Sequence, residues 1–155
     1  MDWPHVHLAL NHLPVVGLPV LLGLLTVALG RGDRWWTRLL LGALAALGLA
    51  SIGIQFTGDL ARQSLARWPG LDDSLVTRHE QAADQATTAL FLGLLACVAG
   101  GWMSRGQRPI PRVAALGTLA LLAVACGLLV RAAHTGGQIR HPEIRPGYAP
   151  PAAQR

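Results

Sequence analysis

The residues of this chain that are best suited to chemistry are its histidines. An imidazole can bind a metal ion or a haem iron, and it can exchange a proton near neutral pH. The sequence holds six of them, which are His5, His7, His12, His79, His134 and His141. No Cys-x-x-Cys-His motif occurs, so covalent attachment of a c-type haem is excluded. Neither a hydrolase triad nor a phosphate-binding loop is recognisable, and hydrolase or kinase chemistry has no support.

The elements that must position these histidines are four long apolar segments. Of the 155 residues, 52% are hydrophobic and 14% are charged, and the mean hydropathy is +0.39. A helix needs about 20 residues to cross a bilayer core of about 30 Å. The uncharged segments predict membrane spans at about residues 5–30, 36–59, 74–104 and 111–134. We therefore expect an all-α, transmembrane four-helix bundle that forms one domain over residues 1–146, followed by a flexible tail at 147–155.

The basic residues predict how this bundle lies in a membrane. All 13 are arginines, and three lie in each of the short connections 31–38 and 105–112. By the positive-inside rule these connections face the cytoplasm. We expect an up-down-up-down protein of the bacterial inner membrane with both termini on the periplasmic side. The positive charge is explained by this topology, so a nucleic-acid partner is not expected. Asp2 stands where a secretory signal would carry a basic residue, and we interpret the first segment as a retained helix.

In this topology all six histidines fall in the outer half of the protein. His12 lies about seven residues, or roughly 10 Å, into the first helix. Polar residues at such a depth usually face the interior of a bundle and mark function. His79 lies two turns into the third helix, and Ala83, Thr87 and Leu90 continue its face. His134 is expected to close the fourth helix.

Two histidines are expected to be bystanders at the outer surface. His5 is seven residues before His12 and lies on nearly the same helical face, whereas His7 lies on a different face.

Asp59 is expected to end the second helix. Cys97 and Cys126 lie inside apolar segments without a redox spacing and are interpreted as packing residues.

The leading hypothesis is a b-type haem that serves electron transfer near the outer leaflet. Such a haem needs two axial histidines on different helices at matched depth. His12 and His79 form the preferred pair. His134 either replaces one of them or borders the haem propionates together with Arg78 or Arg131.

Two alternatives remain open. The first is a non-haem site for zinc, copper(II) or iron, with ligands from His12, His79, Glu80, His134 and His141, to which Glu143 could be added. The Glu-x-x-His motifs of a di-iron centre are absent. The second is a cofactor-free accessory subunit of a larger membrane complex, or a homo-oligomer. None of the three readings predicts a stand-alone enzyme.

Several short motifs resemble a family of four-span bacterial membrane proteins that is classified as a domain of unknown function. The motifs are His7-Leu-Ala-Leu-Asn-His12-Leu-Pro14, Thr57-Gly58-Asp59, His79 and the pair Gly136-Gly137. The resemblance covers about residues 5–145. Such domains occur fused to electron-transfer modules, so the resemblance implies a redox setting but carries over no established activity. The pattern does not require the segment around His141 and Glu143.

Overall fold

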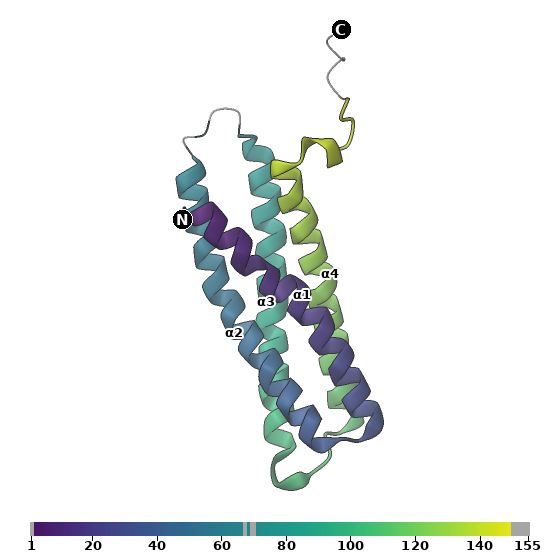
Figure 1. The fold of residues 1–155 in the computed structure, drawn as a ribbon. Coiled ribbons are helices and arrows are strands. Elements are labelled where there is room, and N and C mark those ends of the chain that lie inside the picture. The colour runs from purple at the N-terminus through teal and green to yellow at the C-terminus, as the bar shows by residue number, and fades with distance from the viewer. Residues whose placement is uncertain (1, 67, 69–70, 150–155) are drawn as a thin grey trace.

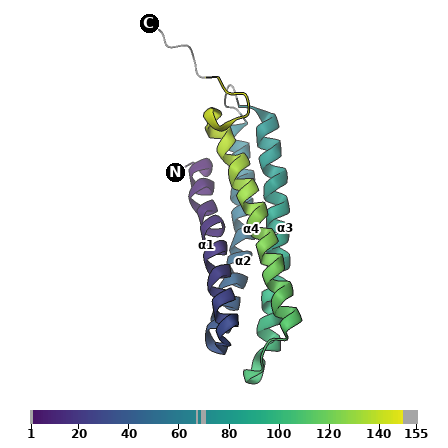
Figure 2. The same ribbon diagram turned by 90° about the vertical axis from the view of Figure 1, so that its right-hand side faces the viewer.

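The computed structural model describes residues 2–66, 68 and 71–149, and it confirms an all-helical fold with four long helices. These are α1 (Trp3–Arg31), α2 (Arg34–Leu65), α3 (Asp73–Met103) and α4 (Arg112–Arg140). Two short 3-10 helices, η1 (Arg105–Gln107) and η2 (Pro142–Ile144), precede and follow α4. No strand occurs in the described residues. Figures 1 and 2 show the four long helices packed side by side as an elongated bundle.

Each of the four helices is long and apolar enough to cross a membrane. Many of their large apolar side chains also lie on the outer surface of the bundle. Examples are Val113, Leu116 and Leu49, with exposed fractions of 84%, 66% and 63%. An outer surface of this kind is costly in water and favourable in hydrocarbon. The inner surface of the bundle is formed by leucine and alanine, including Leu18, Leu25, Ala82 and Ala125 at 0% exposure.

Aspartates start three of the helices by accepting hydrogen bonds from backbone amides that have no partner within the helix. Asp2 accepts from the amide of His5, Asp33 from that of Trp36 and Asp72 from that of Ser74. Two tight connections, at Gly32 (φ 67°) and Gly106 (φ 65°), use the left-handed backbone that glycine adopts most easily.

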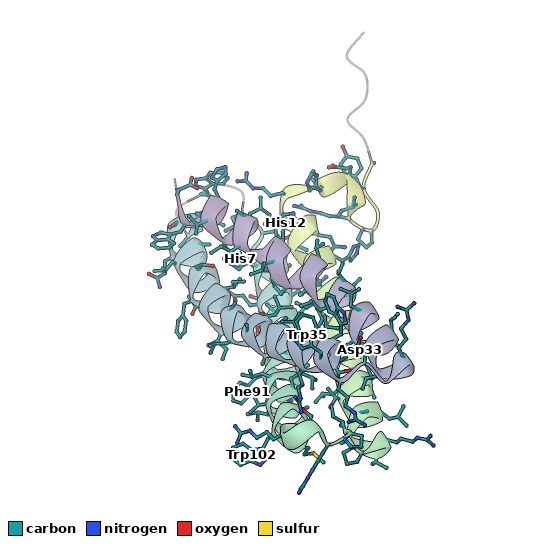
Figure 3. The ribbon with its side chains drawn as sticks, turned by 60° about the horizontal axis from the view of Figure 1, so that its bottom comes forward. His7, His12, Asp33, Trp35, Phe91 and Trp102 are labelled. Carbon is teal, nitrogen blue, oxygen red and sulfur yellow. The ribbon has the colours of Figure 1, made fainter. Side chains whose placement is uncertain are left out.

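The bundle has two chemically different ends. The histidine end comprises the starts of α1 and α3 and the ends of α2 and α4, which are joined by contacts such as His7 to Thr57 and His79 to Ala132. The arginine end comprises the connections 31–34 and 104–112. Figure 3 shows His7 and His12 at the first end, and Asp33, Trp35 and Trp102 toward the other.

Two helices extend further than the sequence predicts. α2 ends at Leu65 and α4 at Arg140, each six residues beyond the expected end of the span, so neither Asp59 nor His134 closes its helix. In α4 the helix continues through Gly136 and Gly137, which disfavour helix by about 1 kcal/mol each. Gly136 packs closely against the ring of His79 on α3, and this contact offsets part of that cost. Most of the segment 147–155, which was expected to be a flexible tail, falls outside the described residues, because these end at residue 149.

Candidate functional site

A small cavity with several polar side chains in its lining lies inside the bundle near the histidine end. Its volume is about 30 Å³, and residues of all four helices line it. The polar members of this lining are His7, Asn11, Ser51, Gln55, His79 and Thr87. A cavity of this size has room for one or two water molecules. Polar groups gathered inside an otherwise apolar bundle are a functional-site signal in membrane proteins.

His7 reaches the cavity because it continues the buried face of α1. That face contains Pro14, Leu18, Leu25 and Ala28. Counting back by seven residues, which is close to two helical turns, leads from Pro14 to His7 and from Leu18 to Asn11. Both side chains are half-buried. The expectation that His7 is a surface bystander is therefore wrong.

His12 points the other way. It lies on the exposed face of α1, where its Nδ1 is 2.7 Å from the carbonyl oxygen of Leu8 in the preceding turn. His5 is exposed as well, so the two do share a face, but that face points away from the bundle. The expectation that His12 faces the bundle interior is wrong, because a shift of five residues from His7 rotates a side chain by about 140° around the helix.

The hydrogen bonds of His7 fix which ring nitrogen carries its hydrogen. Its Nδ1 lies 3.0 Å from the hydroxyl oxygen of Thr57, and that hydroxyl donates its own hydrogen to the carbonyl oxygen of Ile54 at 2.6 Å. The Thr57 oxygen can then only accept from His7, so Nδ1 is protonated in the neutral ring. The lone pair is left on Nε2.

His79 has the same tautomer for a simpler reason. Its Nδ1 lies 3.0 Å from the carbonyl oxygen of Ala132 on α4, and a carbonyl oxygen only accepts hydrogen bonds. Nδ1 must therefore donate, and Nε2 again carries the lone pair. A histidine that binds a metal commonly has this arrangement, with its second nitrogen donating to a carbonyl or another oxygen.

Each imidazole packs against a glycine of the neighbouring helix. A Cβ atom added to Gly58 would lie 3.1 Å from Cε1 of His7, and one added to Gly136 would lie 2.9 Å from Cε1 of His79. Both distances are shorter than an ordinary van der Waals contact. The two glycines thus set the depth of the rings inside the bundle.

The two rings face the same cavity from α1 and α3. Their centres are 6.4 Å apart and their planes are inclined by 71°. Below them, Thr87 donates to the amide oxygen of Gln55 at 3.2 Å, and Gln55 donates to Asp84 at 2.6 Å. Asn11 has no hydrogen-bond partner among the described residues, so its amide can serve a bound water or ligand.

The remaining residues proposed from the sequence are not brought together. Glu80 pairs with Arg62, His141 pairs with Glu143 at 2.8 Å, and His134 accepts a hydrogen bond from Gln138 at 3.1 Å. His134 and His141 are exposed. Among the described residues there is no group of three or more histidines, cysteines or carboxylates that could hold a metal ion. The structure therefore does not gather His12, His79, Glu80, His134 and His141 into one group.

The two arginines considered for haem propionates lie outside the cavity lining. Arg131 is exposed and donates to Gln85 at 2.9 Å, and Arg78 is exposed on α3. Of the cysteines, Cys97 is buried in the core and Cys126 is half-buried, and neither forms a disulfide.

Sequence reasoning missed Asn11, Ser51 and Gln55 and gave His7 the wrong orientation. The seven-residue spacing of His7 and Pro14, and of Asn11 and Leu18, was the signal that could have found the first helix's contribution. Comparison with protein-family models, curated proteins and solved structures gives no match for this chain.

Proposed function

We propose that this chain is a membrane protein that binds haem b between His7 and His79 and takes part in electron transfer. The observation that carries the proposal is the pair of imidazoles on α1 and α3, each held by a hydrogen bond at Nδ1 so that Nε2 can bind a metal. The proposal retains His79 from the sequence-based hypothesis and replaces His12 by His7.

The spacing of the two rings supports this choice. Imidazoles whose ring centres are roughly 6 Å apart are close enough to share one metal ion with metal–nitrogen bonds of about 2 Å. The centres of His7 and His79 are 6.4 Å apart. No other pair of histidines in the described residues forms a ring contact.

The small size of the cavity means that haem binding requires the helices to move apart. A volume of about 30 Å³ does not hold a porphyrin, so haem entry requires the pair α1–α2 to move away from the pair α3–α4 at the histidine end. Parting the two pairs breaks the α1–α4 and α2–α3 contacts, which together are less extensive than the α1–α2 and α3–α4 contacts within the pairs. When bound, haem b supplies one-electron chemistry. His7 and His79 would hold the iron, and Thr57 and Ala132 would orient the two rings through their hydrogen bonds at Nδ1.

An optical spectrum of the detergent-purified protein, expressed with added haem precursor, tests the proposal. We expect a Soret band and bis-histidine α and β bands on reduction. These bands are lost in His7→Ala and His79→Ala and kept in His12→Ala and His134→Ala. His12→Ala is the matched control, since it removes an imidazole from the same helix five residues away. The proposal is contradicted if the wild-type protein takes up no haem. It is also contradicted if His12→Ala loses the haem while His7→Ala and His79→Ala keep it.

A second candidate is a single first-row transition-metal ion between the same two imidazoles, with water completing its coordination. The small cavity favours it, because about 30 Å³ suits an ion with one water. Elemental analysis of purified protein separates the two candidates. The second predicts one equivalent of zinc, copper or iron without a Soret band, lost in His7→Ala and kept in His12→Ala.

We further propose that the helices cross the bacterial inner membrane alternately, with both termini and the haem site on the periplasmic side. The arginines of the connections 31–38 and 105–112 support this orientation.

A further inference from the structure

A second cavity lies at the arginine end, between α2 and α3. Its volume is about 430 Å³, within the range of small-molecule binding pockets. The walls are formed by small or apolar residues of the two helices, and Arg38 and Arg105 lie at one end of it. The lining residues other than these arginines are Leu41, Gly42, Ala45, Cys97, Val98, Gly101 and Gly106. We call this cavity the α2–α3 groove.

Two glycines keep the groove open. A Cβ atom added to Gly42 or Gly101 would meet no atom within 4 Å, so helix packing does not require glycine at either position. Gly48, about 9 Å further along α2, is different: a Cβ there would lie 2.9 Å from Cβ of Leu94 on α3. The helices therefore touch at Gly48 and leave unfilled space beside Gly42 and Gly101.

The two arginines of the groove have no carboxylate partner in the part of the chain that the structure describes. Arg38 is half-buried and is oriented by Ser104, whose carbonyl and hydroxyl oxygens accept hydrogen bonds from its guanidinium. Arg105 stacks on the ring of Trp102, with its guanidinium carbon 3.6 Å from the ring centre. Among the described residues, neither Arg38 nor Arg105 forms an ion pair with a carboxylate. Asp33, the one carboxylate in segments 27–47 and 95–116, caps α2.

The surroundings of the groove select an amphipathic occupant. Val98 on its wall is 55% exposed and Trp102 beside Arg105 is 65% exposed, on helices that are apolar enough to span a membrane. A tryptophan at the end of such a helix marks the level of the lipid headgroups. An apolar chain thus fits the glycine-lined part of the groove, and an anionic group fits the arginines.

We propose that the α2–α3 groove binds one anionic phospholipid, with its phosphate between Arg38 and Arg105 and one acyl chain along Gly42 and Gly101. Basic pockets between transmembrane helices bind lipid headgroups in this way. The arginines satisfy the phosphate, while the missing side chains of the two glycines provide the volume for the chain. This lipid site is independent of the histidine site.

Native mass spectrometry of the detergent-purified protein tests the charged half of the site. We expect one equivalent of phosphatidylglycerol to be retained in preference to phosphatidylcholine. Arg38→Gln and Arg105→Gln should each weaken retention about fivefold, the effect of one arginine near a lipid surface. Arg112→Gln is the matched control, because Arg112 lies at the same end but outside the groove. Equal retention of both lipids, or an equal effect of Arg112→Gln, overturns the proposal.

Filling the groove tests the apolar half. Gly42→Leu and Gly101→Leu meet no packed atom at Cβ and should fold with wild-type helix content by circular dichroism, yet lose the bound phosphatidylglycerol. Gly53→Leu, at another open position on α2, should keep it. Inorganic phosphate at millimolar concentration should not displace the lipid. Displacement would show that the acyl chain of the lipid contributes nothing to binding, which contradicts the proposal. If Gly42→Leu instead converts a dimer to a monomer and leaves lipid retention unchanged, the groove is a contact between copies and the lipid proposal is overturned.

Discussion

At the scale of single residues, the site depends on hydrogen bonds that select one tautomer of each imidazole. Thr57 accepts from His7 because its own hydroxyl hydrogen is already donated to Ile54. The carbonyl of Ala132 plays the same part for His79. Such outer partners commonly change metal affinity by 10- to 100-fold when they are removed. Thr57 belongs to a motif that is visible in the sequence, whereas nothing in the sequence marks Ala132.

Thr57→Val tests the tautomer argument. Valine has nearly the same shape as threonine but cannot accept a hydrogen bond, so Nδ1 of His7 loses its partner. We expect haem or metal affinity to fall by about 10- to 100-fold with unchanged helix content, measured by titration of the purified protein. Thr57→Ser keeps the hydroxyl and should restore most of the affinity. If valine and serine behave alike, the hydroxyl does not position His7.

Gly136→Ala tests the close packing of the His79 ring. The new methyl group would lie 2.9 Å from Cε1 of His79, so the ring must shift. Overpacking of this kind typically costs about 1–3 kcal/mol, while the better helix propensity of alanine returns about 1 kcal/mol. We expect a thermal midpoint in detergent that is lower by a few degrees, together with weaker ligand binding.

Gly127→Ala is the matched control for that substitution. Gly127 lies on the same helix, and a Cβ there meets nothing within 4 Å. It should leave ligand binding unchanged and leave the midpoint equal or slightly higher. A Gly136→Ala protein with the properties of Gly127→Ala would contradict the packing argument.

At the scale of elements, helix ends at the histidine end depend on ionised aspartates. Asp72 caps α3, and hydrogen bonds from the side chain and then the backbone of Ser74 hold the pKa of its carboxyl below the usual range. A carboxyl with a lowered pKa in the folded state stabilises that state above its ordinary pKa of about 3.9 and loses the effect as the pH falls toward the lowered value.

Hydrogen exchange of the first turn of α3 checks this pH dependence. We expect the protection of its amides to decrease as the pH falls below about 4. Asp72→Asn keeps a good cap without a titrating group, so its protection should not change over the same interval. Asp73→Asn leaves the cap in place and should behave as the wild type. Equal pH dependence in Asp72→Asn and wild type would exclude Asp72 as the cause.

At the scale of the whole molecule, two helical hairpins supply equivalent parts of one site. Arg-Gly-x-Arg occurs at residues 31–34 and 105–108, and Thr-Gly occurs at 57–58 and 135–136. In each hairpin a histidine of the first helix packs on the glycine of that Thr-Gly pair in the second helix. The weak likeness between the two halves of the sequence therefore corresponds to a structural equivalence at the histidine pair.

Reporter fusions test the orientation of this assembly. Alkaline phosphatase is active only outside the cytoplasm, so a fusion after Tyr148 should be active and a fusion after Arg108 should be inactive. The arginines of the two short connections provide the physical reason. Replacing Arg105, Arg108 and Arg112 by glutamine should reduce the difference in phosphatase activity between the two fusions. The opposite pattern of activities would place the histidine site on the cytoplasmic side.

The sequence by itself determined the four helices, because each needs only a long apolar segment and local capping groups such as Asp72. It also indicated that the histidines gather at one end, since alternating spans bring the segments that carry them to the same side. The helical face of His79 with Ala83, Thr87 and Leu90 was readable as well, and all four residues line the cavity. These features depend on neighbours along the chain, where the 3.6-residue period makes the outcome predictable.

Only the tertiary structure decided which imidazoles meet. His7 and His12 are both polar residues near the start of α1, and their order in depth favoured His12. The rotation of α1 is set by packing of Leu18 and Leu25 against the other helices, and this rotation turns His7 inward and His12 outward. The continuation of α4 past Gly136 has the same origin, because contact with His79 outweighs a poor local helix propensity. Helix rotation and helix length at these points result from contacts between distant segments, which no local pattern contains.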